Sequence, residues 1–273
     1  MQDGGALIAT QDVWAQETKI MFTPENELEK SLMKAATDPA HRPQFYKDFI
    51  NSEIFVIRHG PLPEKEGRTV LKEGMQLQIQ PIEINEKTYL PIFSSVTRLR
   101  DTIQKEVGFL GLNALEFLKI TRGADLMLNP GSAYGKEFVK EEVERLLDGT
   151  MWKPSQTYVA EKDTKILIGQ PKNYPQALVD TLSRLFKNVR DVKSAYLAHY
   201  HNPEEGDPPH TLIGISAAGN WEEIVAQAGM VARDVDVPDP PVDFIHIETN
   251  ESLSEYFLKG CKPFYKRKTW ALF

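Results

Sequence analysis

Two histidines, His199 and His201, stand two positions apart in a stretch that predicts a strand, and His210 follows after an acidic segment. Residues i and i+2 of a strand point to the same face, and imidazoles together with a carboxylate can hold zinc or iron. The spacing lacks the fixed pattern of a specific metal site, and residues 202–209 are also typical of an acidic hairpin loop. The sequence therefore predicts no bound metal or other cofactor, and it keeps these three histidines as the candidate ligands.

The one cysteine, Cys261, is the candidate nucleophile. Sulfur transfer needs a thiolate that can carry a persulfide, and basic residues surround this cysteine in the sequence. They are Lys259, Lys262, Lys266, Arg267 and Lys268. The cysteine does not stand in a rigid loop that feeds a helix, and a lone cysteine is often simply tolerated. Because the chain also lacks the Gly-x-Ser-x-Gly, His-Glu-x-x-His and Gly-x-Gly-x-x-Gly motifs, a protein without catalytic residues is the favoured interpretation.

A glycine turn is the candidate anion site. It contains Asn129, Gly131 and Ser132, and it separates an apolar run at residues 125–128 from an amphipathic pattern that ends at Gly149. Proline and glycine favour a type II turn, and Ser132 is placed to cap a helix, so we predict strand, turn and helix. Free N–H groups at that helix start could bind an anion. No Gly-Lys-Ser/Thr follows, which favours a purely structural turn.

The chain ends in a basic and aromatic tail, for which two interpretations are open. In one, Phe264 and Tyr265 pack onto the second domain while the lysines remain in solvent. In the other, Phe264, Tyr265, Arg267 and Trp270 contact a partner protein, because aromatic residues and arginine are enriched at the cores of interfaces.

Length and composition predict a two-domain protein of a reducing compartment. At 273 residues the chain can form two hydrophobic cores. The formal net charge of −7 argues against nonspecific nucleic-acid or anionic-membrane binding. A single cysteine excludes an internal disulfide, no apolar run approaches the ~20 residues of a membrane span, and the start lacks the basic residues of a signal peptide. We therefore expect a cytoplasmic protein with neither nucleic acid nor membrane as a partner.

Both domains are expected to be α+β. Residues 1–21 contain two adjacent glycines and little periodicity, which predicts a loosely ordered extension. Residues 22–149 mix helices with a mixed, largely antiparallel sheet. Residues 150–164 are too apolar for a free tether, so we expect an ordered linker in which Trp152 and Tyr158 pack against one of the domains.

Residues 165–273 follow the order β-α-β-β-α-β, which is that of a ferredoxin-like sandwich. The expected arrangement is a four-stranded antiparallel sheet with two helices on one face. A helical tail is predicted from Ser252 to Leu258, before the basic aromatic tail.

Local signals predict several element boundaries. Thr23, Ser95, Asn113 and Asn220 each stand where an N-cap is expected before an apolar periodic pattern. The turn Asn85-Glu-Lys87 separates two runs of period two, which predicts an antiparallel hairpin.

A set of short stretches resembles the SseB family, which is named for enhanced serine sensitivity. These stretches are Tyr89–Ser95 and Ala124–Tyr134 in the first half, and Gly169–Pro175, Ala195–Leu197, Gln227–Gly229, Val242–Phe244 and Pro263–Arg267 in the second. The resemblance covers about residues 22–268 in the expected order. It implies a soluble bacterial protein with an N-terminal and a C-terminal SseB-type domain, and it supplies no catalytic residues. Such proteins have been associated with sulfurtransferases, and similar domains occur near bacterial toxins as candidate immunity proteins.

The favoured function is therefore binding of another protein, and its more specific form is an immunity protein whose acidic surface covers a basic toxin. The alternative is a sulfurtransferase-associated factor in serine and sulfur amino-acid metabolism that uses Cys261. The sequence does not define an oligomeric state.

Overall fold

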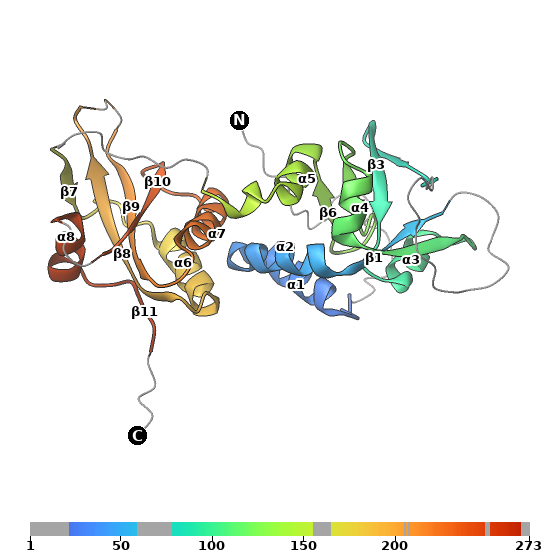
Figure 1. The fold of residues 1–273 in the computed structure, drawn as a ribbon, viewed down its shortest axis with the longest axis horizontal. Coiled ribbons are helices and arrows are strands. Elements are labelled where there is room, and N and C mark those ends of the chain that lie inside the picture. The colour runs from blue at the N-terminus through green and yellow to red at the C-terminus, as the bar shows by residue number, and fades with distance from the viewer. Residues whose placement is uncertain are drawn as a thin grey trace, which may run out of the picture. The chain divides into compact units, whose positions relative to one another are not determined.

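The computed structural model describes residues 22–58, 78–154, 165–204, 206, 208–248 and 252–268. These residues form two compact units (Figure 1), and each combines helices with sheets, which confirms the α+β class. The second unit contains Asp38–Pro43 together with the described residues from Trp152 onward, and the first contains the others. None of the helices in these described parts is long and apolar enough to span a membrane.

The first unit contains a mixed sheet and several helices. Its elements are α1 (Glu27–Thr37), α2 (Arg42–Asn51), β1 (Glu53–Ile57), β2 (Ile82–Ile84), β3 (Lys87–Ile92), α3 (Val96–Thr102), β4 (Phe109–Asn113), α4 (Ala114–Ile120), β5 (Leu126–Leu128), β6 (Lys136–Phe138), α5 (Lys140–Leu147) and the short helix η2 (Thr150–Trp152). The first two residues of α2 and the last of η2 belong to the second unit. Strands run in the order β2-β3-β5-β6, and β1 pairs separately with β4. The β3–β5 pair is parallel and the other pairs are antiparallel, as a mixed and largely antiparallel sheet requires.

Local capping signals are largely confirmed. Ser95, Asn113 and Asn220 each accept a hydrogen bond from a backbone N–H three residues on. The hairpin is confirmed as well, because β2 and β3 are joined by Asn85 and Glu86, with φ of 51° and 64°. Two residues of positive φ match the twist of the flanking strands.

The predicted strand, turn and helix over residues 125–149 is wrong in its middle. After β5 the turn leads into strand β6, which pairs antiparallel with β5, and α5 begins only at Lys140. Lys136 and Phe138 are buried while Glu137 between them is partly exposed, so the pattern has period two rather than the helical period. Ser132 therefore does not cap a helix, and the turn lacks the helix N-terminus that the anion hypothesis needs.

The second unit follows the predicted element order. Its elements are the short helix η1 (Pro39–His41), then β7 (Leu167–Gly169), α6 (Gln176–Asn188), β8 (Val192–His201), β9 (His210–Ala217), α7 (Trp221–Arg233), β10 (Val242–His246), α8 (Ser252–Gly260) and β11 (Tyr265–Lys266). The helical tail predicted from Ser252 is confirmed as α8. Ala40 packs with the core beneath α6, and Arg184 of α6 donates to the Asp38 carboxylate at 2.6 and 3.2 Å.

The strand arrangement of this unit differs from an antiparallel ferredoxin-like sheet. The order is β10-β9-β8-β11 with β7 also on β8, and β10 lies parallel to β9. In the expected sheet the first strand would lie beside the last one. Here β7 has only three residues and pairs with the end of β8, while α7 is long enough to return the chain for a parallel pair.

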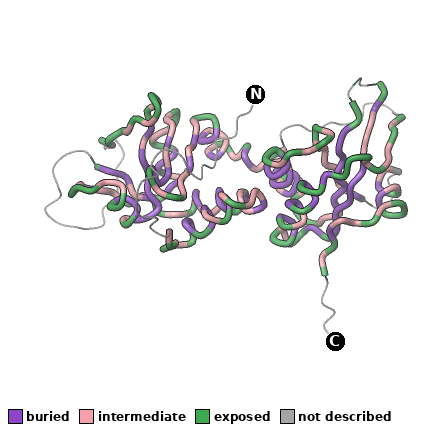
Figure 2. Tube along the Cα trace, turned by 180° about the vertical axis from the view of Figure 1, so that it is seen from behind, coloured by how far each residue is buried: buried purple, intermediate pink, exposed green. Residues whose placement is uncertain are grey.

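Helices cover both faces of this sheet (Figure 1). Leu182 of α6 and Val231 of α7 share one core with Leu197 and Ile213 of the central strands. Phe257 of α8 packs on the opposite face. The two central strands are accordingly buried over most of their length (Figure 2).

Some predictions fall on residues outside the described ranges. Met151 is buried and Trp152 is half-buried in η2, but Tyr158 belongs to residues 155–164, which are not described. The ordered linker therefore stays a prediction, as does the loosely ordered extension at residues 1–21.

Candidate functional site

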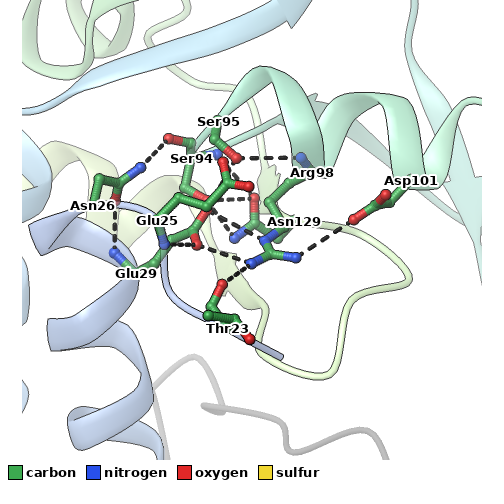
Figure 3. Close-up of polar contacts among 9 residues, drawn as sticks. All are labelled: Thr23, Glu25, Asn26, Glu29, Ser94, Ser95, Arg98, Asp101 and Asn129. Atoms are coloured by element: carbon green, nitrogen blue, oxygen red, sulfur yellow. Dashed lines mark hydrogen bonds and ion pairs between the residues drawn. The ribbon is translucent and has the colours of Figure 1, made fainter. Parts of the chain in front are cut away.

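A buried ion pair joins α1 to α3 in the first unit (Figure 3). The Glu29 side chain is fully buried and that of Arg98 is 8% exposed, with Arg98 Nη2 3.0 Å from Glu29 Oε2. The hydroxyls of Ser94 and Ser95 donate to Glu29 Oε1 at 2.7 and 3.1 Å. The Glu25 amide donates to Oε2 at 2.9 Å. The carboxylate thus receives enough donors to replace the water it has lost.

Helix α1 begins at Glu27, later than the cap expected at Thr23, and its ion pair with α3 was not predicted. Asn26, not Thr23, accepts the hydrogen bond from the Glu29 amide. An Asn followed three residues later by a Glu is the pattern of a capping box, so the position of Glu29 near a helix start could have been found. Its pairing with Arg98, 69 residues away, has no local signal.

A second buried cluster lies beneath β6. The fully buried Lys136 ammonium is 3.0 Å from Glu142 Oε1 and donates to the Glu137 carbonyl at 2.8 Å. The Tyr46 hydroxyl donates to the same Glu142 carboxylate. The ammonium also lies 4.8 Å from the centroid of the Phe138 ring, a cation–π contact. These groups satisfy one another within the core.

A hollow of about 390 Å³ opens beside β3 in the first unit. It is lined by Thr88, Tyr89, Leu90, Gly123, Ala124, Asp125 and Lys140. Asp125 of this lining pairs with Lys87, whose ammonium lies 3.0 Å from Asp125 Oδ2 and 2.6 Å from Glu137 Oε1. The hydrogen bonds to Glu137 and Asp125 raise the pKa of Lys87, which favours its charged form. Burial and the hydrogen bond to Glu137 raise the pKa of Tyr89.

The three candidate histidines do not converge. His199 and His201 share one face of β8, as predicted, but Tyr200 pairs directly with His210. Directly opposed residues share a face, so His210 points to the other side of the sheet, where it contacts Asp243 at 2.9 Å. His199 Nε2 lies 3.6 Å from Asp239 Oδ2. Among the described residues no group of three metal-ligating side chains comes together.

Cys261 has polar neighbours at the end of α8. Its Sγ accepts a hydrogen bond from Gln170 Nε2 at 3.2 Å, and the same amide lies 3.4 Å from the Tyr256 hydroxyl. Burial raises the pKa of Tyr256, and the adjacent Cys261 adds to this. The thiol is half-buried.

Two family models match this chain. The SseB protein N-terminal domain matches residues 28–145, and the SseB protein C-terminal domain matches residues 160–267. The chain belongs to the SseB family. It is 32% identical to Protein SseB of Escherichia coli (strain K12) over 251 aligned residues. This aligned stretch covers 91% of this chain and 95% of the Escherichia coli protein. Protein SseB of Shigella flexneri is similar to the same extent. No solved structure matches the chain.

The stretches that carried the SseB resemblance contribute contacts that hold the structure together. Asn129 has φ of 50°, and its side chain accepts from the Ser94 amide and donates to the Ser94 hydroxyl, both at 2.9 Å. It therefore holds the serine pair that contacts Glu29. Gln170, from the second half, contacts Cys261.

The C-terminal tail of this SseB protein packs on its own domain. Tyr265 is buried and donates to the Phe186 carbonyl at 2.9 Å, and Phe264 stacks on the Phe186 ring. Arg267 donates to the carbonyls of Phe186, Val189 and Val192 at 2.7 to 2.9 Å. These three residues thus make contacts within their own unit, in line with the first of the two interpretations, and their contact with a partner stays a prediction. Trp270 lies outside the described residues.

Arg267→Ala should destabilise the second unit by about 2–3 kcal/mol, because it removes charged hydrogen bonds to carbonyls at the C-terminus of α6. The measurement is the midpoint of urea denaturation at pH 7. Lys268→Ala, which changes the exposed neighbouring residue, should shift stability by less than about 0.5 kcal/mol. Equal effects of the two variants would contradict this role of Arg267.

Glu29 should make the stability of the first unit depend on pH. Burial alone would raise its pKa, but the hydrogen bonds from Arg98, Glu25 and Ser94 outweigh burial and hold the pKa below the ordinary 4.5. Because the pKa is lower in the folded state, the ionised carboxylate stabilises the fold at pH values above its ordinary pKa of 4.5. This stabilisation is lost as the pH falls below 4.5. Glu29→Gln should remove this part of the pH dependence and cost about 3–5 kcal/mol at pH 7.

The control is Glu27→Gln on the same helix, where the side chain is 83% exposed. Urea denaturation of the three proteins between pH 7 and pH 3 measures the effect. If the stability of Glu29→Gln changes with pH as steeply as that of the wild type, the buried carboxylate is not the source of the pH dependence.

Proposed function

We propose that this SseB-family protein acts by binding another protein of basic character. The observation that carries the proposal is the engagement of its buried charges. Glu29 with Arg98, and Lys136 with Glu142, satisfy each other within the core. These four buried charged side chains of the first unit therefore pair with one another, and the proposal places the partner on surface features of the unit.

The hollow beside β3 supports a basic partner. Asp125 in its lining shares the Lys87 ammonium with Glu137, and Lys140 Nζ lies 3.7 Å from Glu141 Oε1. The two charged residues that line the hollow, Asp125 and Lys140, cancel, and with their partners Lys87, Glu137 and Glu141 the formal charge is −1, in a chain whose net charge is −7. Leu90 and Ala124 in the wall could receive the methylene stem of a lysine or arginine.

The specific form of this proposal is an immunity protein that neutralises a basic toxin. Opposite net charges accelerate encounter and disfavour wrong partners, and rapid capture is what a neutralising protein requires. A hollow with paired charges beside it also suits a single anchoring side chain of the partner. In many interfaces a few such residues contribute most of the binding energy.

Thr88→Arg should weaken partner binding about tenfold or more, because it places a bulky cation in the hollow. Thr97→Arg is the matched control, since both threonines are exposed and only Thr88 lines the hollow. The wild type and both variants are used to purify partners from the native host, and the proteins recovered are identified by mass spectrometry. Affinity is then measured with the purified partner, including any toxin encoded beside the gene.

Recovery of a basic protein by the wild type and Thr97→Arg, but not by Thr88→Arg, supports the proposal. Equal binding by all three proteins would exclude the hollow as the binding site. Turnover of a small molecule with no recovered partner would overturn the proposed protein-binding function.

Sulfur transfer through Cys261 is the second candidate, favoured by the hydrogen bond from Gln170 to its Sγ. An amide donor stabilises a sulfur that carries negative charge. In such a reaction the thiolate attacks the outer sulfur of thiosulfate, forms a persulfide and releases sulfite.

Cys261→Ser should abolish any thiosulfate-dependent transfer, whereas Gln170→Ala should slow it without abolishing it, since the nucleophile remains. The measurement is sulfite release together with the mass of the protein persulfide. Activity that is absent from the wild type, or unchanged in Cys261→Ser, removes this candidate.

A further inference from the structure

The donors around Glu29 form a compact receptor for a carboxylate (Figure 3). Oε1 accepts from Ser94 Oγ, Ser95 Oγ and Arg98 Nε at 2.7, 3.1 and 3.3 Å. Oε2 accepts from Arg98 Nη2 and the Glu25 amide at 3.0 and 2.9 Å. Both oxygens are therefore satisfied by donors from separate segments of the chain.

Most of these donors are held in place by groups other than Glu29. Asn129 Nδ2 donates to Ser94 Oγ at 2.9 Å and its Oδ1 accepts from the Ser94 amide. Ser95 Oγ accepts from the Arg98 amide at 3.2 Å. The Arg98 guanidinium donates to the Thr23 carbonyl at 2.6 Å and to Asp101 at 3.4 Å. It also lies 3.9 Å from the centre of the Phe22 ring.

We propose that Ser94, Ser95, Arg98 and Asn129 form a carboxylate-binding site whose ligand is the chain's own Glu29. Removal of the Glu29 side chain beyond Cβ leaves room for one methylene carbon and one carboxylate, which are the heavy atoms of acetate. A free small monocarboxylate then takes the place of the side chain. The inference concerns the recognition chemistry of this site and does not depend on the partner proposed above.

The physical reason is the cost of an unpaired buried charge. Without Glu29 the buried Arg98 guanidinium loses its buried carboxylate partner and keeps only the exposed carboxylate of Asp101, 3.4 Å away. A ligand that binds only the folded state raises the ratio of folded to unfolded protein by the factor 1 + [L]/Kd. Each tenfold increase in acetate above its Kd should thus raise that ratio about tenfold in Glu29→Ala.

The test is urea denaturation of Glu29→Ala in increasing sodium acetate, with sodium chloride at equal ionic strength as the reference. The expected result is a rise of the midpoint with acetate that exceeds the rise with chloride. Pivalate, which is too bulky, should give no such rise. Neither the wild type nor Glu29→Gln should respond specifically, because a side chain of the same size already fills the site in both.

An equal response of Glu29→Ala to acetate and chloride would overturn the proposal, as would an equal acetate response of Glu29→Gln. If Glu29→Ala is unfolded without acetate, the same titration is followed by circular dichroism. Recovery of the native signal in acetate but not in chloride supports the site, and failure to recover in acetate counts against it.

Discussion

A charge can leave water for a protein core only where a partner charge and hydrogen bonds take the place of its hydration. Glu29 and Arg98 meet this condition together, and they do so from helices that are far apart in the sequence. Because neither is satisfied alone, the pair forces α1, α3 and the ends of β3 and β5 into one arrangement. Asn129, whose φ is positive, adds a hydrogen bond to the Ser94 amide in the same region.

The need to satisfy buried polar groups also explains the structural roles of residues in the stretches that resemble the SseB family. Asn129 holds a serine backbone amide that the sheet does not pair, and Arg267 satisfies carbonyls at the end of α6. Both residues complete the hydrogen bonding of backbone that helices and strands leave unpaired. Family resemblance in such positions indicates a shared fold rather than shared chemistry.

Features set by neighbouring residues were predictable from the sequence. The caps at Ser95, Asn113 and Asn220 and the hairpin turn depend on contacts within a few residues. Several features set by the pairing of one strand with another were not predicted. Strand β6 exists because β5 lies beside it, and β10 is parallel because α7 returns the chain to β9. The candidate site was affected in the same way, since strand register places His210 on the face opposite His199.

The short segment Asp38–Pro43 shows that the boundary between the structural units does not coincide with the boundary between the two family domains. It belongs structurally to the second unit, although it lies within the 28–145 match of the N-terminal family model. A gene fragment that begins at the linker would lack the carboxylate that pairs with Arg184 and the small side chain of Ala40 beneath α6. Such a fragment would contain the whole match to the C-terminal family model and still lack a part of the second structural unit.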